Sequence, residues 1–301
     1  MSTSSLTKLN YVNLVAYGLN VLFTYGIGVA GLFNLPDNTV LSEKYQTLVT
    51  PIGWAFSIWG PIFISEAIFT LAQLLPKYRD NAIVVDGVGY WYAAVCLAQI
   101  FWTLSFSLEH LWLAAIFMFT ILAFLAKLVS SCYKLGAAET NGQYWLFKFP
   151  FELHLGWIIA ASFVNFSVLF VAYGADDNEP TQLAVAVLSL AGVVAAALYL
   201  LFVLERPLVT TGGVGAWALG GIAAQLTYPF EKTQEAFGDL VLTGLTGASG
   251  FASIVFAVIT VLNIFYLVYK NCFGAAVNAK KENGDAMTRK LSVPLTGLET
   301  V

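Results

Sequence analysis

Apolar stretches alternate along this chain with short polar connections. A helix needs about 20 mainly apolar residues to cross the hydrocarbon core of a bilayer. Eight stretches meet this requirement, and the connections between them carry the Pro, Asp, Asn and Lys residues that end helices. The predicted spans are 11–33, 51–75, 88–108, 111–133, 153–174, 182–204, 208–228 and 245–269. The pattern predicts an all-α bundle of about eight transmembrane helices.

Two of these spans have unusual features. Only Glu109 and His110 separate the third span from the fourth, which predicts a tight helical hairpin. The seventh span, 208–228, contains five glycines, which lower both its hydropathy and its helix propensity. Glycine is nevertheless common in membrane helices, where it permits close packing. We therefore keep 208–228 as a span.

Composition supports a membrane protein. The chain is 58% apolar and only 11% charged, whereas a soluble domain has about 45–50% apolar and about 25% charged residues. The net charge is -4 and no basic patch lies outside the C-terminal tail, so no nucleic-acid partner is expected. Cys96, Cys132 and Cys272 lack the spacing of a disulfide framework or a metal site. We expect an integral, multi-pass protein; the sequence does not indicate which membrane.

The basic residues predict the orientation of the spans. With eight spans, twelve of the 14 Lys and Arg residues fall on one side, and only Lys44 and Lys232 fall on the other. Cytoplasmic loops carry the excess of Lys and Arg. Residues 1–10 are then a cytoplasmic N-terminus, and the polar residues 271–301 are a cytoplasmic tail predicted to be disordered.

Candidate chemistry is sparse. The chain has two histidines, His110 and His154, and no metalloprotease, nucleophile-elbow, P-loop or dinucleotide motif, so we do not expect an enzyme. Glu66 lies inside the second span, where an ionisable group is by default a functional-site hypothesis. The alternative is that Glu66 only forms a hydrogen bond to a neighbouring side chain.

Aromatic residues form short patterned segments. The second span opens with Pro51, Gly53, Trp54, Phe56 and Trp59 in the pattern P-x-G-W-x-F-x-x-W, and Pro61 is expected to kink this helix. The third span contains Trp102. In the fifth span Trp157, Ala161 and Asn165 are spaced four residues apart, so they share one helix face.

In the order and spacing of these segments the chain resembles the TspO/MBR family of translocator and tryptophan-rich sensory proteins, especially its long, eight-helix members. The resemblance implies a five-helix core over 11–174 and a three-helix extension over 175–270, where Ala216, Trp217 and Ala218 also resemble a segment of the long members. Two departures stand out. Thr50-Pro51 replaces the usual double proline, and His154 stands where an aromatic residue is expected.

The resemblance implies an apolar, tryptophan-lined cavity that binds flat hydrophobic molecules: porphyrins and other tetrapyrroles, and sterols in animals. The residues themselves do not predict a particular cofactor or a metal. His154 could ligate the iron of a metalloporphyrin or, as the alternative, bond the connection between the fourth and fifth spans. The candidate ligand-binding residues are Trp54, Phe56, Trp59, Glu66, Trp102, His154, Trp157, Ala161 and Asn165.

The leading hypothesis is a non-enzymatic membrane receptor, sensor or carrier for a tetrapyrrole-like or lipidic ligand. The alternatives are a secondary transporter coupled to protons through Glu66, an enzyme acting on a lipid or a tetrapyrrole, and a structural subunit of a membrane complex. Expected partners are membrane lipids, a hydrophobic small molecule and a second copy of the chain. The homodimer would use close-contact glycines at Gly28, Gly31, Gly244, Gly247 and Gly250; the alternative is that these glycines pack helices within one chain.

Overall fold

The computed structural model describes residues 5–135, 141–173 and 178–291. Helix makes up 82% of the chain, and no strand occurs in these ranges, which confirms the all-α class. The chain divides into two compact units, Met1–Ala257 and Val258–Val301. The bundle and both chambers described below belong to the first unit.

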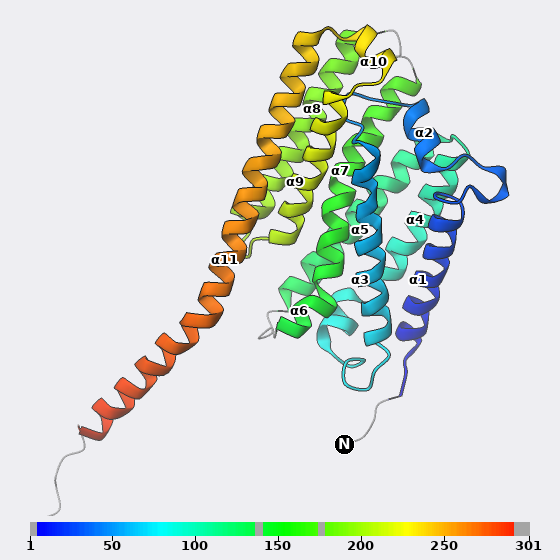
Figure 1. Cartoon of the computed structure of the whole chain (residues 1–301). Helices are drawn as coiled ribbons and strands as arrows, with labels where there is room; N and C mark the ends of the chain where they lie inside the picture. Colours follow the sequence, from blue (N-terminus) through cyan, green and yellow to red (C-terminus); the bar gives the residue numbers. More distant parts are fainter. Residues whose placement is uncertain (1–4, 136–140, 174–177, 292–301) are drawn as a thin grey trace, which may run out of the picture. The chain divides into compact units, whose positions relative to one another are not determined.

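Each predicted span corresponds to one long helix in the described residues (Figure 1). The long helices are α1 (Lys8–Gly26), α3 (Trp59–Ala72), α4 (Trp91–Ser107), α5 (Leu111–Lys134), α7 (Phe149–Ala172), α8 (Glu179–Leu198), α9 (Val209–Thr227) and α11 (Asp239–Leu291). Shorter elements join or extend them: η1 (Leu32–Asn34), α2 (Asn38–Lys44), η2 (Gly53–Ile58), η3 (Ile83–Val88), α6 (Asn141–Phe147), η4 (Tyr199–Val203) and α10 (Glu231–Ala236).

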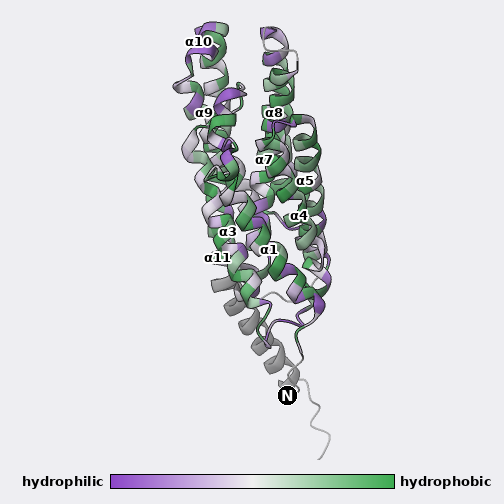
Figure 2. Cartoon of the chain, turned by 90° about the vertical axis from the view of Figure 1, so that its right-hand side faces the viewer, coloured by the Kyte–Doolittle hydropathy of each residue, from purple (hydrophilic) through white to green (hydrophobic). Residues whose placement is uncertain are grey.

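Five helical segments are long and apolar enough to cross a membrane. They are Gly53–Ala72, Leu111–Lys134, Phe149–Ala172, Glu179–Val203 and Asp239–Tyr269, and α4 is a shorter apolar helix. Helices α1 and α9 have the length but carry asparagines and glycines, respectively, which lower their hydropathy. Apolar residues run along most of α5 and α8 (Figure 2). Large apolar side chains such as Ile64, Leu71 and Leu188 are exposed, as lipid-facing residues would be.

The ends of two helices, α1 and α7, differ from the sequence-based expectation, and the hairpin between α4 and α5 agrees with it. Helix α1 ends at Gly26 rather than at 33, because Gly31, Phe33 and Asn34 adopt left-handed backbone angles that no α-helix contains. Helix α7 begins at Phe149 rather than at 153, with Pro150 in its first turn, where the missing N–H costs nothing. The hairpin between α4 and α5 is as tight as predicted, with Glu109 in the left-handed conformation.

The predicted disordered tail, 271–301, also differs. Helix α11 continues to Leu291, and only 292–301 lie outside the described residues. The segment 275–291 is rich in Ala and Lys, both good helix formers, and contains no proline. The described part of the tail is therefore helical, and the prediction of a disordered cytoplasmic tail stays a prediction for 292–301, which lie outside the described residues.

Helix α7 is the centre of the first unit. It packs against α3, α5, α8 and α9, and most of its side chains are buried. Gly156 lets α9 approach, because a Cβ there would lie 2.7 Å from Cβ of Val214. This close contact places one face of α9 beside the face of α7 that carries Trp157 and Ala161.

Candidate functional site

The residues after Pro51 form a 3-10 helix, η2, that runs directly into α3. Pro61 lies in the first turn of α3, where no intrahelical bond to its nitrogen is required, so the change from 3-10 to α-helix takes the place of the expected kink. The backbone N–H of Ile52 donates to the carbonyl of Gly221 over 3.0 Å. The start of η2 is therefore held against α9.

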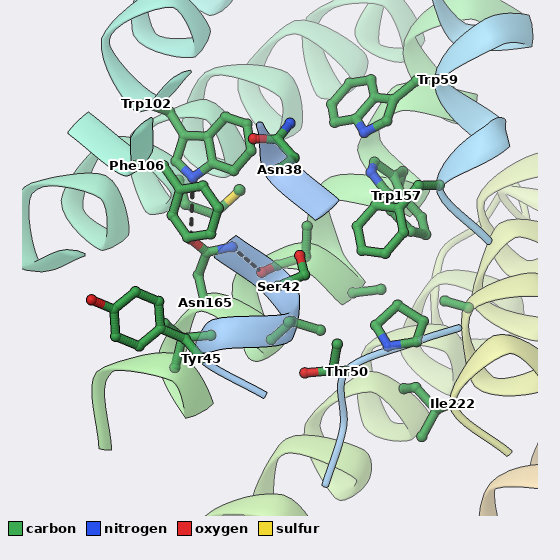
Figure 3. Close-up of a pocket in the computed structure, with 18 residues that line it drawn as sticks. Asn38, Ser42, Tyr45, Thr50, Trp59, Trp102, Phe106, Trp157, Asn165 and Ile222 are labelled. Carbon is green, nitrogen blue, oxygen red and sulfur yellow. Dashed lines mark hydrogen bonds between the residues drawn. The ribbon is translucent and has the colours of Figure 1, made fainter. Parts of the chain in front are cut away.

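An aromatic chamber, here called the inner chamber, lies between η2, α4, α5, α7 and α9 (Figure 3). Its free volume, counted with the open space at its mouth, is about 710 Å³. Six predicted site residues line it: Phe56, Trp59, Trp102, Trp157, Ala161 and Asn165. The structure thus brings together the three patterned segments that the sequence singled out.

The rings stand on two sides of this chamber. Trp102 and Phe106 are stacked on one side with centroids 5.4 Å apart, and Trp59 and Trp157 lie on the other (Figure 3). The centroid of Trp157 is 5.6 Å from Phe56 and 6.3 Å from Trp59, with both ring pairs edge to face. These edge-to-face contacts make Phe56, Trp59 and Trp157 one continuous aromatic wall.

Asn165 holds the indole of Trp102. The Trp102 Nε1–H donates to Asn165 Oδ1 over 3.1 Å, and Asn165 Nδ2 donates to the carbonyl of Ala161 over 2.9 Å. The amide therefore forms a hydrogen bond between α4 and α7. These contacts position the Trp102 indole, and direct contact of Asn165 with a ligand stays a prediction.

A second, more polar space, here called the outer chamber, adjoins the first. It shares Phe56, Trp59 and Pro51 with the inner chamber, and has a free volume of about 1070 Å³ with its open side included. Polar groups come from α2, from Ser57 and from Gln225 at the end of α9. Among the residues that line the two chambers, none is Lys or Arg. An apolar interior with a polar mouth results.

Helix α2 covers the chambers and is anchored at both ends. Asp37 caps it by accepting hydrogen bonds from the backbone N–H groups of Thr39 and Val40 over 2.8 and 3.0 Å. At the other end Lys44 and Tyr45 both donate to the carboxylate of Glu109, in the turn between α4 and α5. The hydrogen bond from Lys44 lowers the pKa of Glu109, and the same bond raises the pKa of Lys44.

Glu66 and His154 form a buried pair that lines neither chamber. The carboxylate Oε1 lies 2.7 Å from His154 Nδ1, and the Tyr92 hydroxyl donates to Oε2 over 3.3 Å. Both side chains of the pair are 0% exposed. The imidazole centroid is 5.6 Å from that of Trp59, so the pair lies directly behind the chamber wall. The alternative that His154 bonds the connection before α7 was wrong, because its partner is on α3.

Trp54 points away from the inner chamber. It is 46% exposed and packs edge to face on Trp217 of α9, with centroids 4.7 Å apart. The Trp217 indole in turn donates to the carbonyl of Ala55 over 2.9 Å. Trp54 therefore helps to dock η2 on α9 and is not among the residues that line the two chambers, so its contact with a ligand stays a prediction.

The sequence missed the contributions of α2 and α9. Asn38 and Ser42 of α2 and Ala218 and Ile222 of α9 line the inner chamber. The spacing of Ala218 and Ile222 is helical, but nothing in that spacing reveals which helix they face. The extension 175–270 is therefore part of the chamber wall. Within the described residues no group of three His, Cys, Asp or Glu could hold a metal ion.

Comparison with known proteins gives one match. A family model described as TSPO-like protein matches residues 10–262, which include every helix that lines the chambers. No curated protein and no solved structure matches the chain.

Proposed function

This chain belongs to the family of TSPO-like proteins, which are polytopic membrane proteins, and on that premise we propose that it is a non-enzymatic receptor, sensor or carrier for a flat hydrophobic ligand. The observation that carries the proposal is the inner chamber, with three indoles and two phenyl rings in its wall. Aromatic faces give planar molecules a large contact area and lose little conformational entropy. A tetrapyrrole or a flat lipid is the ligand class that fits.

The chamber walls also define how such a ligand would lie. Its ring system would lie between the Trp102–Phe106 pair on one side and Trp59 and Trp157 on the other. Its polar end would lie in the outer chamber beside Ser57 and Gln225, which offer hydroxyl and amide groups. We infer that the ligand enters through the outer chamber, whose open side faces the outside of the protein.

The proposed topology is eight spans with both termini in the cytoplasm. The eight long helices of the described residues support it together with the separation of basic residues, twelve against two. A homodimer is the partner we propose beyond lipids and the ligand. Gly28 packs on Asn38, and Gly250 faces Ala223, so both are used within the chain. A Cβ added at Gly244 or Gly247 would have no atom of this chain within 4 Å. These two positions are the ones that leave room for a second copy.

Protoporphyrin IX is expected to quench the tryptophan fluorescence of the purified protein saturably. Trp157→Ala should weaken this binding about tenfold, because the variant loses one ring wall of the inner chamber. Trp145→Phe is the matched control, since Trp145 is 58% exposed on α6 and lines neither chamber. Quenching that never saturates, or equal affinity in the wild type and Trp157→Ala, would contradict the proposal.

The dimethyl ester of protoporphyrin IX is expected to bind within about threefold of the free acid. The free acid carries two carboxylates, and a carboxylate gains affinity on binding only where a cation or strong donor replaces its hydration. No Lys or Arg is among the residues that line the chambers. Competition between the two compounds measures the ratio. A tenfold advantage of the free acid would indicate a basic contact that the chamber walls do not contain.

A further inference from the structure

Buried polar residues recur on three neighbouring helices of the first unit. We call the following six the polar seam: Asn13 and Asn20 of α1, Glu66 and Thr70 of α3, and Gln99 and Thr103 of α4. None of the six is more than 1% exposed. Within each helix the two residues are four or seven positions apart, so they lie on one face. Helix α1 packs on both α3 and α4, and Tyr92 links α4 to Glu66.

Half of the seam has polar atoms without a hydrogen-bond partner in the described part of the protein. They are Asn13 Oδ1, Thr103 Oγ1 and both amide atoms of Gln99, whereas Thr70 interacts with the Tyr92 hydroxyl and Asn20 with the Cys96 thiol. Buried polar groups are almost always bonded to protein or to ordered water, and a buried water bridges about three such groups. A purely structural seam would pair these atoms with one another. Their arrangement instead suits a row of bound waters.

The seam includes one member of a titratable pair. Glu66 Oε1 and His154 Nδ1 are joined by a 2.7 Å hydrogen bond, along which a proton can pass from one side chain to the other. His154 Nε2 is a further buried atom without a partner in the described residues. The titratable groups that face the pair are Tyr17 of α1 and Tyr92 and Cys96 of α4. Adding or removing a proton creates a buried charge, which needs nearby dipoles or water.

One end of the seam is closed by side chains. Asn10 Nδ2 donates to the carbonyl of Gln73 over 3.2 Å, and Gln73 Nε2 donates to the carbonyl of Asn10 over 3.3 Å. Asn13 adds bonds to Gln73 Oε1 and to the carbonyl of Gly89. These contacts join the start of α1 to the end of α3, on the proposed cytoplasmic side.

We propose that the polar seam holds bound water and conducts protons across the membrane, with the Glu66–His154 pair as its proton-binding site. Uptake of one proton from water converts a carboxylate beside an imidazolium into a carboxylic acid beside an imidazolium. Release of one proton to water on the other side restores the neutral pair. This activity goes beyond ligand binding and does not require it, so the two can be tested separately.

The test uses the full chain in liposomes that contain a pH-sensitive dye. A potassium gradient with valinomycin sets the membrane potential, and the rate of internal pH change reports proton flux. Wild-type protein is expected to raise the rate severalfold above protein-free liposomes, and Glu66→Gln to return it to the protein-free level. Glu152→Gln is the matched control: Glu152 is also buried, but its carboxylate accepts hydrogen bonds from Tyr133 and Tyr144, away from the seam.

A second variant covers the case in which Glu66→Gln does not fold. Gln99→Leu replaces an amide that has no partner in the described residues, so folding should be retained while an apolar side chain interrupts the row of waters. Flux is expected to fall at least tenfold, with unchanged protoporphyrin binding showing that the chambers are intact. Wild-type flux no greater than that of protein-free liposomes would overturn the proposal. So would flux that survives either seam variant, because the polar groups would then be only structural.

Discussion

Replacing His154 with alanine is expected to lower the free energy of unfolding by about 3–5 kcal/mol. Glu66 would then be 0% exposed with one remaining hydrogen bond, the 3.3 Å bond from Tyr92. A buried carboxylate without its partner must either keep an uncompensated charge or hold a proton at a cost in free energy. Reversible unfolding in mixed detergent, followed by circular dichroism, measures the loss.

The double variant Glu66→Leu with His154→Leu separates the pair from simple packing. Replacing both members of a buried ion pair with apolar residues is often neutral, so the double variant should be more stable than His154→Ala alone. The two single leucine variants complete the cycle and should show a coupling of about 3 kcal/mol or less. A loss below about 1 kcal/mol for His154→Ala would mean that Glu66 does not depend on the imidazole.

Gly221→Ala is expected to reduce protoporphyrin affinity more than tenfold and to destabilise the protein by about 1–3 kcal/mol. A Cβ at Gly221 would lie 2.7 Å from Cβ of Ala55 and 3.2 Å from Cβ of Pro51. Helix α9 would have to move away from η2, and Ala218 and Ile222 would move with it, which widens the chamber wall. Titration of tryptophan fluorescence and unfolding in mixed detergent give the two quantities.

Gly215→Ala is the matched control on the same helix. Its Cβ would meet Ala197 Cβ at 3.7 Å, an ordinary contact, so binding should be unchanged. Stability should stay the same or rise slightly, because alanine favours the helical backbone over glycine. If both variants lost binding equally, a general effect of alanine on α9 would be responsible rather than the contact with η2.

The helices could be predicted from the sequence because each contains a long run of apolar residues, whether these side chains are buried in the bundle or exposed on its surface. The gathering of Phe56, Trp102 and Trp157 followed from segments whose order and spacing resemble a known family. The pairing of Glu66 with His154 could not be predicted, because 88 residues separate them and only packing of α3 on α7 joins them. The orientation of Trp54 was missed for a related reason: the partner that turns it outwards is Trp217, from another part of the chain.

The five-helix core implied by the family resemblance does not contain all the helices that line the chambers. Its five-helix core, 11–174, was expected to hold the ligand alone, and the last three helices had no assigned purpose. Helix α9 nevertheless supplies Ala218 and Ile222 to the inner chamber and Gln225 to the outer one. Glycines in α9 and α7 allow this, since they let α9 pack closely on α7 and η2. The same glycines lower the hydropathy of α9.

The anchoring of α2 has a kinetic consequence. Lys44 and Tyr45 reach the same carboxylate, so one group, Glu109, holds the C-terminal end of α2, which lines both chambers. A movement of α2 that widens the open side of the outer chamber would break both hydrogen bonds together. We therefore expect the residence time of the ligand to depend on a residue that never touches it. Equilibrium affinity, set by the rings, would change far less.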